Sequence, residues 1–234
     1  MIRLLDILAA AFALAAAAPG QAPPKPPKIP FSDESLRYSV NWPSGLSLGE
    51  ALMQSSRSEG RWNFAFSLDA SVPGLSMKDG YRSVAAGDFC SAELSKHFLH
   101  GTRTGDEKTT FDPPSGTATR LTLGGGKSQI AIPACPRDAL AFLYYLRHEL
   151  SAGRLPGPQT VYFGAPYQVR LAFGGRQMVQ VNDEPAEADR VTASVEGPAS
   201  QLTIELYFSR DADRAPVLVR VPLPAGSFSM ELLR

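Results

Sequence analysis

The chain has 234 residues, of which 44% are hydrophobic, and its 23 basic residues balance its 23 acidic residues to a formal net charge of zero. A chain of this length and hydrophobic content can bury a substantial core. No long basic block appears, which argues against non-specific nucleic-acid binding and against a polybasic anchor at a membrane surface, because both depend on clustered Lys and Arg.

Residues 1–17 have the features of a secretory signal peptide. Arg3 supplies the positive charge, an apolar run follows it, and the small residues Ala15 and Ala17 suit cleavage between Ala17 and Ala18. The apolar run is shorter than the roughly 20 residues that a membrane-spanning helix needs. We therefore expect a periplasmic or secreted protein whose mature chain has no transmembrane segment.

The segment 18–30 is rich in proline, with six prolines among thirteen residues. Such a composition favours extended polyproline II and does not contribute to a packed core. The segment can be a spacer that holds the following domain away from a surface, or a disordered N-terminal tail. Both interpretations fit the sequence.

From residue 31 to residue 234 the chain predicts a single β-rich domain. Apolar and polar residues alternate over 36–42, which is typical of a half-buried strand, and residues 46–56 and 62–72 continue the pattern. Glycine-containing turns are predicted at 105–107 and 124–126, and the acidic run 183–189 is predicted to be a loop. Further strands are predicted at 90–102, 108–112, 117–123, 128–132, 159–163, 167–173, 177–181, 190–195, 201–209, 216–221 and 227–233. The fold class expected is mainly β, an antiparallel curved sheet or a barrel-like domain.

One segment has helical periodicity, and the spacing predicts an amphipathic helix over 136–152. Pro136 suits the first turn, Asp138 places an acid near the positive end of the helix dipole, and Gly153 suits the C-terminal end. The apolar stripe that we expect to pack on the sheet consists of Ala139, Phe142, Leu143, Leu146 and Leu150.

Cys90 and Cys135 are the two cysteines of the chain. In an oxidising compartment an even pair favours a disulfide, which would close a long loop and stabilise the fold by at most ~4 kcal/mol in the chain-entropy model. The alternative is two buried, unpaired cysteines. A bridge would tie the start of the helix to the strand that begins near Cys90.

Three motifs resemble chemical sites, and we interpret each as structural. Gly45 to Gly49 matches G-x-S-x-G but lies between strands instead of at a strand-to-helix turn. The glycines at 124–126 lack the spacing and the helix of a phosphate loop. His97 and His100 lie three apart on a strand and so point to opposite faces. The sequence predicts no catalytic residues, no metal site and no cofactor.

Four blocks of the sequence resemble those of a known family and occur in the same order along the chain. The chain from about 31 to 234 resembles the exported bacterial family called domain of unknown function 3108 (DUF3108), although Tyr207 stands where a tryptophan is usual. The resemblance implies an exported, mainly antiparallel β fold with one helix, and it implies no established activity. The matching positions are Tyr38, Trp42, Gly45, Gly49, Asp138, Tyr144, Arg147, Asp211, Arg214 and Pro216.

Two functions fit these observations. The first is a periplasmic binding or carrier protein for a lipid or another apolar or amphipathic envelope molecule, with a helix across a curved sheet as the ligand cradle. The second is a structural module that binds an envelope protein through a sheet edge. A hydrolase is the weakest hypothesis. We expect Asp211 and Arg214 to form a short-range ion pair in a tight turn, with a structural role.

Overall fold

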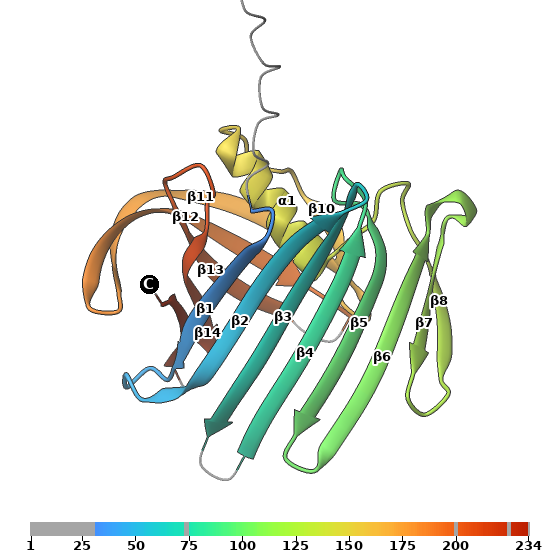
Figure 1. Ribbon diagram of the computed structural model, residues 1–234, viewed down its shortest axis with the longest axis horizontal. Coiled ribbons are helices and arrows are strands. Elements are labelled where there is room, and N and C mark those ends of the chain that lie inside the picture. Colours follow the sequence, from blue (N-terminus) through green and yellow to red (C-terminus); the bar gives the residue numbers. More distant parts are fainter. Residues whose placement is uncertain (1–30, 73–74, 199–200, 224–225, 234) are drawn as a thin grey trace, which may run out of the picture.

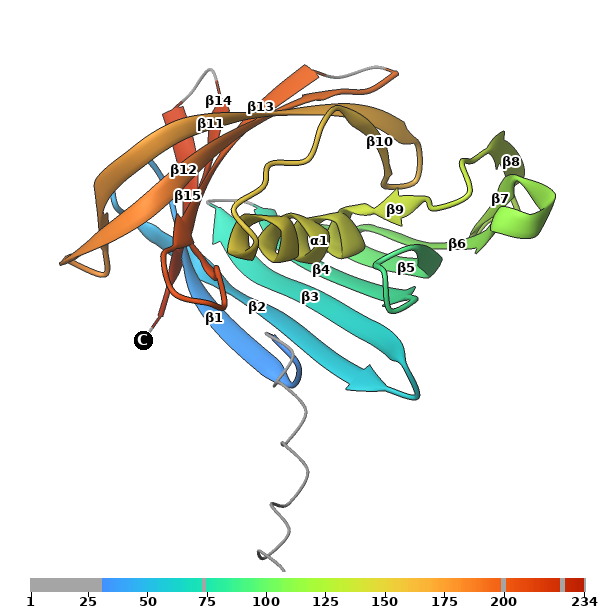
Figure 2. The same cartoon turned by 90° about the horizontal axis from the view of Figure 1, so that it is seen from above.

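The computed structural model describes residues 31–72, 75–198, 201–223 and 226–233, so the predicted signal peptide and Pro-rich segment lie outside the described residues. The described chain forms one 15-stranded sheet that curves around a single α-helix (Figures 1 and 2). The predicted mainly β fold is confirmed. The two end strands of the sheet, β8 and β9, do not pair with each other, so the sheet does not close into a barrel.

The first half of the sheet is an antiparallel meander in which each strand pairs with the next one along the chain. A 3-10 turn, Pro113–Ser115, separates β6 from β7. The strands are β1 (Glu34–Asn41), β2 (Ser47–Ser58), β3 (Arg61–Val72), β4 (Leu75–Ala85), β5 (Ser91–His100), β6 (Arg103–Asp112), β7 (Thr117–Thr122) and β8 (Lys127–Ala131).

The second half contains the helix α1 (Ala139–Ser151) and a second meander. Its strands are β9 (Arg137–Asp138), β10 (Gln159–Tyr162), β11 (Pro166–Val181), β12 (Glu184–Glu196), β13 (Gln201–Ser209), β14 (Pro216–Leu223) and β15 (Gly226–Leu232). Strand β15 pairs with β1, which joins the two meanders, whereas β9 and β10 are parallel. The chain therefore leaves the sheet at its β8 edge, joins the opposite edge as β9, forms α1 and returns to the sheet as β10 beside β9.

Strand β4 was not predicted from the sequence, and the turn predicted at 105–107 is wrong. The chain reverses instead at Gly101, whose φ is 62°, and Gly105 pairs with Phe98 inside the sheet. A Cβ at Gly105 would lie 2.4 Å from the Phe98 ring, so this glycine makes room for a side chain and does not form a turn. In β4, Lys-Asp-Gly at 78–80 resembles a turn, but it pairs with β3 and β5 throughout.

The loop predicted over 183–189 is also wrong. The reversal consists of Asn182 and Asp183, both with positive φ as a two-residue hairpin turn requires, and β12 begins at Glu184. The strands predicted at 167–173 and 177–181 form one strand, β11, with a bulge between Phe173 and Arg176.

The helix begins three residues later than predicted, because Asp138 is its N-cap and the two residues before Ala139 form β9. The predicted apolar stripe packs on the sheet, and a second face of the helix does so too, because the two halves of the curved sheet lie on either side of the helix (Figure 2). Leu146 and Leu150 of the predicted stripe are buried, and so are Ala141 and Tyr144, which pack against the first meander. The helix thus contributes side chains to two hydrophobic cores, one formed with the first meander and one with the second.

Candidate ligand-binding cavity

A cavity of about 510 Å³ lies between α1 and the concave face of the sheet. No lining side chain is charged, and Tyr81 and Tyr167 are the lining residues that carry a hydroxyl. Burial raises the pKa of Tyr81, and the neighbouring Asp79 carboxylate raises it further. The cavity is lined by Ala139, Leu140, Phe142, Leu143 and Leu146 of α1, by Met53, Phe66 and Tyr81 of β2–β4, and by Val161, Phe163, Tyr167, Val169, Ala193, Val195, Leu202, Ile204, Leu206, Val219 and Met230.

Strand alternation places the apolar side chains of the second meander on the cavity. Leu202, Ile204 and Leu206 are two residues apart on β13 and therefore point to the same face. They pair directly with Val195, Ala193 and Val191 of β12, which continues the apolar surface across the sheet. The half-buried Ala139 and Leu143 of α1 face this surface across the cavity, which explains why they are less buried than the rest of the predicted stripe.

The start of α1 is anchored by Asp138, whose side chain is fully buried. Its Oδ1 accepts the backbone N–H groups of Leu140 (2.9 Å) and Ala141 (3.1 Å), which caps the helix. Its Oδ2 accepts hydroxyl protons from Ser83 and Ser91, each at 2.6 Å. Burial raises the pKa of the Asp138 carboxyl, and these hydrogen bonds offset the rise only in part.

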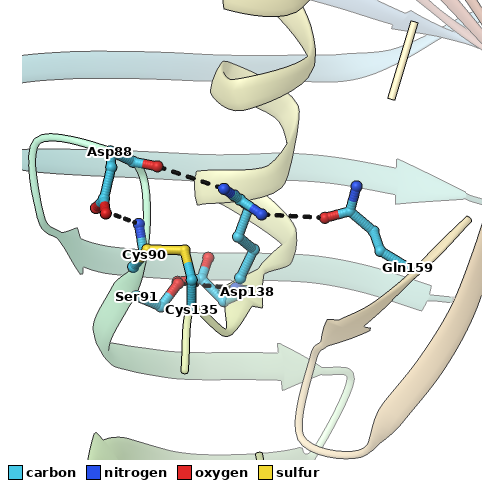
Figure 3. The surroundings of a disulfide bond; sticks show 7 residues. Asp88, Cys90, Ser91, Cys135, Asp138 and Gln159 are labelled. Atoms are coloured by element: carbon cyan, nitrogen blue, oxygen red, sulfur yellow. Dashed lines mark hydrogen bonds between the residues drawn. A yellow bond between two sulfur atoms is a disulfide. The ribbon is translucent and has the colours of Figure 1, made fainter. Parts of the chain in front are cut away.

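A disulfide joins Cys90 to Cys135 at the same end of the helix (Figure 3), as the sequence predicted. The Cα atoms are 4.8 Å apart, within the range for disulfides. The N–H of Ser91 donates to the carbonyl of Pro136 at 2.8 Å. Arg137 reaches the Asp88 carbonyl at 3.5 Å and Gln159 at 3.3 Å. The bridge thus ties the start of β5 to the residues that precede α1.

Reduction of this disulfide is expected to loosen α1 before the central sheet, because the bridge constrains the approach to the helix and lies outside the pairing of β2 with β3. The Cys90→Ser/Cys135→Ser double variant should lose less than the ~4 kcal/mol entropic maximum. Hydrogen exchange of the α1 amides, compared with those of β2 and β3, measures the effect. Two titratable thiols in denatured, unreduced protein would contradict the bridge.

The C-terminal half of α1 is anchored by Arg147, whose side chain is fully buried. Its two terminal nitrogens each lie 2.7 Å from an oxygen of Glu34, a bidentate ion pair that joins the helix to β1. The same guanidinium donates to the carbonyls of Asp213 (2.9 Å) and Arg214 (3.1 Å). Burial alone would lower the pKa of Arg147, but the Glu34 carboxylate raises it above its ordinary value.

The predicted tight turn at Asp211–Arg214 is present, but the predicted ion pair between these residues is not. Asp211 Oδ1 instead accepts the hydroxyl of Ser209 (2.8 Å) and the backbone N–H groups of Asp213 and Arg214 (both 3.1 Å). Arg214 pairs with Asp189 of β12 at 2.6 Å. Its φ of 47° directs the chain through the turn, and its side chain lies toward β12.

Other family-motif positions also have contacts of a structural kind. Tyr38 is fully buried, and the ring of Trp42 meets that of Phe228 edge to face at 4.5 Å. Gly45 has a φ of 82° in the β1–β2 turn. At Gly49, with a φ of 152°, a Cβ would lie 2.0 Å from the carbonyl oxygen of Asp69 on β3.

Tyr144 stacks on Phe64 at 4.2 Å, and Pro216 pairs with Phe208. The aromatic residues that line the cavity are Phe66, Tyr81, Phe142, Phe163 and Tyr167. Trp62 and Phe64 are in the core. The apolar lining that β10–β14 contribute was missed, although its alternation is visible in the sequence.

The motifs interpreted as structural have structural surroundings. Gly45 to Gly49 leads into β2 with no helix. His97 pairs with Asp106 and His100 with Asp79, from opposite faces of β5. Among the described residues, the one group with metal-ligand atoms in proximity contains both cysteines, whose sulfurs are engaged in the disulfide.

The sequence of the chain matches the model of one protein family over residues 37–233, a family described as a protein of unknown function, DUF3108. The chain belongs to the DUF3108 family. This DUF3108 protein has no match among the curated proteins. In the part that the structure describes, no helix is both long and apolar enough to cross a membrane.

The fold of this DUF3108 protein is similar to a solved structure, the crystal structure of a β-barrel-like protein of domain of unknown function DUF1849 from Brucella abortus. The TM-score is 0.62, and the match covers 88% of this chain and 98% of that chain at 9% sequence identity. At this identity the similarity shows a shared fold and carries no information on activity.

Proposed function

We propose that this DUF3108 protein is an exported binding or carrier protein for an apolar or amphipathic molecule of the cell envelope. The observation that carries the proposal is the cavity of about 510 Å³ between α1 and the sheet. Its size is within the range of small-molecule sites, and its lining excludes charged groups. A ligand therefore gains free energy chiefly by transferring apolar surface out of water.

Two further observations support the proposal. The helix is held rigidly at both ends, by Asp138 and the disulfide at one end and by the Arg147–Glu34 pair at the other. The helical wall of the cavity is therefore pre-formed, so little conformational entropy of the helix is lost when a ligand binds. The signal-like sequence of residues 1–17 supports export, and a disulfide persists in an oxidising compartment.

Filling the cavity is expected to remove the bound molecule without unfolding the protein. Val195 lines the cavity from β12, so Val195→Trp should compete with the ligand for space. The original protein and this variant would be purified from their own envelope and compared by native mass spectrometry. We expect a bound apolar or amphipathic molecule on the original protein and its loss from Val195→Trp at a similar melting temperature.

The matched control is Ser194→Trp, which adds the same ring to the exposed outer face of β12. This variant should retain the bound molecule. Equal retention by both tryptophan variants would contradict the cavity as the binding site.

A role as an interaction module is the second candidate, because the sheet is open. The end strand β8 pairs with β7 on one side, and most of its residues are exposed. Such an edge can accept a strand from a partner protein. A stoichiometric protein in place of a small molecule in the same mass spectra would favour this function.

A further inference from the structure

We infer that the molecule bound in the cavity is an amphiphile with an anionic headgroup, and that Lys96 and Arg120 bind this headgroup at one end of the cavity. The inference rests on the proposed binding function and specifies the chemistry of its ligand. The argument starts from the side chains that share one row across the concave face of the sheet.

The row runs from apolar to charged. Met53, Phe66, Tyr81, Lys96 and Glu107 are direct cross-strand partners on consecutive strands from β2 to β6, so their side chains lie on one face. The first three line the cavity. Because neighbouring strands are about 4.8 Å apart, Lys96 is one strand beyond the last lining residue of this row. An extended amphiphile along the row has its tail in the cavity and its polar end at Lys96.

The ammonium group of Lys96 is in contact with the cavity wall. Its Nζ lies 4.2 Å from the centroid of the Phe163 ring, which lines the cavity, and 3.5 Å from the Phe163 carbonyl oxygen. The Lys96 side chain is only 14% exposed. A charge with so little solvent gains strongly from an additional anionic partner.

The two cations at this end outnumber the carboxylate that they share. Glu107, which is 10% exposed, pairs with Lys96 at 3.1 Å and also with Arg120. Asp79, on the next row of the same face, is engaged by His100 at 2.8 Å. Among the residues that the structure describes, one positive charge of the Lys96–Arg120 pair is therefore left without a carboxylate of its own. A phosphate or carboxylate headgroup would supply the missing negative charge.

The Phe163 side chain separates this charged end from the cavity. Its ring meets the Tyr81 ring edge to face at 5.0 Å, and it belongs to a turn in which Gly164 has a φ of 80°. A Cβ at Gly164 would lie 2.4 Å from a Glu107 oxygen, so the backbone of this turn packs directly against the Lys96–Glu107 ion pair. Headgroup binding would replace the long Lys96–Phe163 carbonyl contact as the Phe163 ring moves aside.

The test compares three amphiphiles that share one tail and differ in headgroup charge: dodecyl phosphate, dodecyl maltoside and dodecyltrimethylammonium. Each is used below its micellar concentration to displace Nile red from the full-length protein. We expect dodecyl phosphate to bind at least about tenfold more tightly than dodecyl maltoside, since a charge-assisted contact with a buried cation contributes that much. Inorganic phosphate alone should not displace the dye.

Lys96→Met should remove the preference, and Arg120→Met, at a side chain that is 38% exposed, should reduce it. The matched control is Lys108→Met, an exposed lysine beside Glu107 that pairs with Glu93. It should leave the preference unchanged.

Equal binding of all three amphiphiles, or an unchanged preference in Lys96→Met and Arg120→Met, would overturn the headgroup assignment and leave the proposed function intact. Nile red that does not bind at all would overturn both, and displacement by inorganic phosphate would indicate a site for the free anion.

Discussion

Replacing Arg147 by methionine is expected to lower the free energy of unfolding by about 3–5 kcal/mol, the range measured when one partner of a buried ion pair is removed. Glu34 would keep its charge, at 13% side-chain exposure, with no guanidinium to bind. The carbonyls of Asp213 and Arg214 would lose their donors at the same time. Urea unfolding followed by circular dichroism measures the loss.

Arg154→Met is the matched control for this variant. Arg154 lies three residues beyond α1 and forms a bidentate ion pair with Glu149, but its side chain is 58% exposed. An exposed pair contributes about 0.2–1 kcal/mol, so the control should lose far less stability. Arg147→Lys keeps the charge and loses the bidentate geometry, and we expect an intermediate loss. A loss for Arg147→Met no larger than that for Arg154→Met would show that the buried pair does not hold the helix.

Asp138→Ala is expected to cost about 3 kcal/mol, because it removes a helix cap worth about 1 kcal/mol and leaves two buried serine hydroxyls without their acceptor. Both Ser83 and Ser91 are buried, at 1% and 2% exposure, so water does not replace the carboxylate. Thermal and urea unfolding measure the loss, and hydrogen exchange should show that the first turn of α1 opens first.

Two variants separate the contributions of Asp138. Asp138→Asn retains one oxygen that can cap the helix or accept a serine hydroxyl, but not both, so its loss should fall between those of the wild type and Asp138→Ala. Asp88→Ala is the control, because Asp88 is exposed and its carboxylate accepts one N–H, that of Cys90, at 3.3 Å. A similar loss for Asp138→Ala and Asp88→Ala would contradict the structural role of the buried cap.

Features that depend on nearby residues could be predicted from the sequence. Alternation identified β1, β2 and β3, and the three-to-four-residue spacing identified α1 to within three residues at its start. Glycine was the misleading residue. The glycine at position 105 favours a turn in the sequence, but Gly105 lies in a strand. The Phe98 ring occupies the space that a side chain at position 105 would need. That reason involves a neighbouring strand and is invisible along the chain.

The partners of the charged family-motif residues could not be predicted. Arg147 pairs with Glu34, 113 residues away, and Arg214 pairs with Asp189 instead of the nearby Asp211. Which carboxylate meets a buried guanidinium depends on which strands the curvature brings together, and many acids in the chain are equally suitable by type. The same holds for Lys96, whose place beside Phe163 depends on the return of the chain from the helix to β10.

The sequence by itself determined most of the strands, the helix and a cysteine pair suited to a bridge, because these follow from local periodicity and from the chemistry of single residues. Only the tertiary structure decided that the sheet curves around the helix and leaves a cavity beside it. An alternating strand such as β13 has the same pattern whether its apolar side chains fill a core or line a cavity. The difference depends on how closely the opposite wall approaches, which is set by the pairing of β1 with β15 and by the anchors at Asp138 and Arg147.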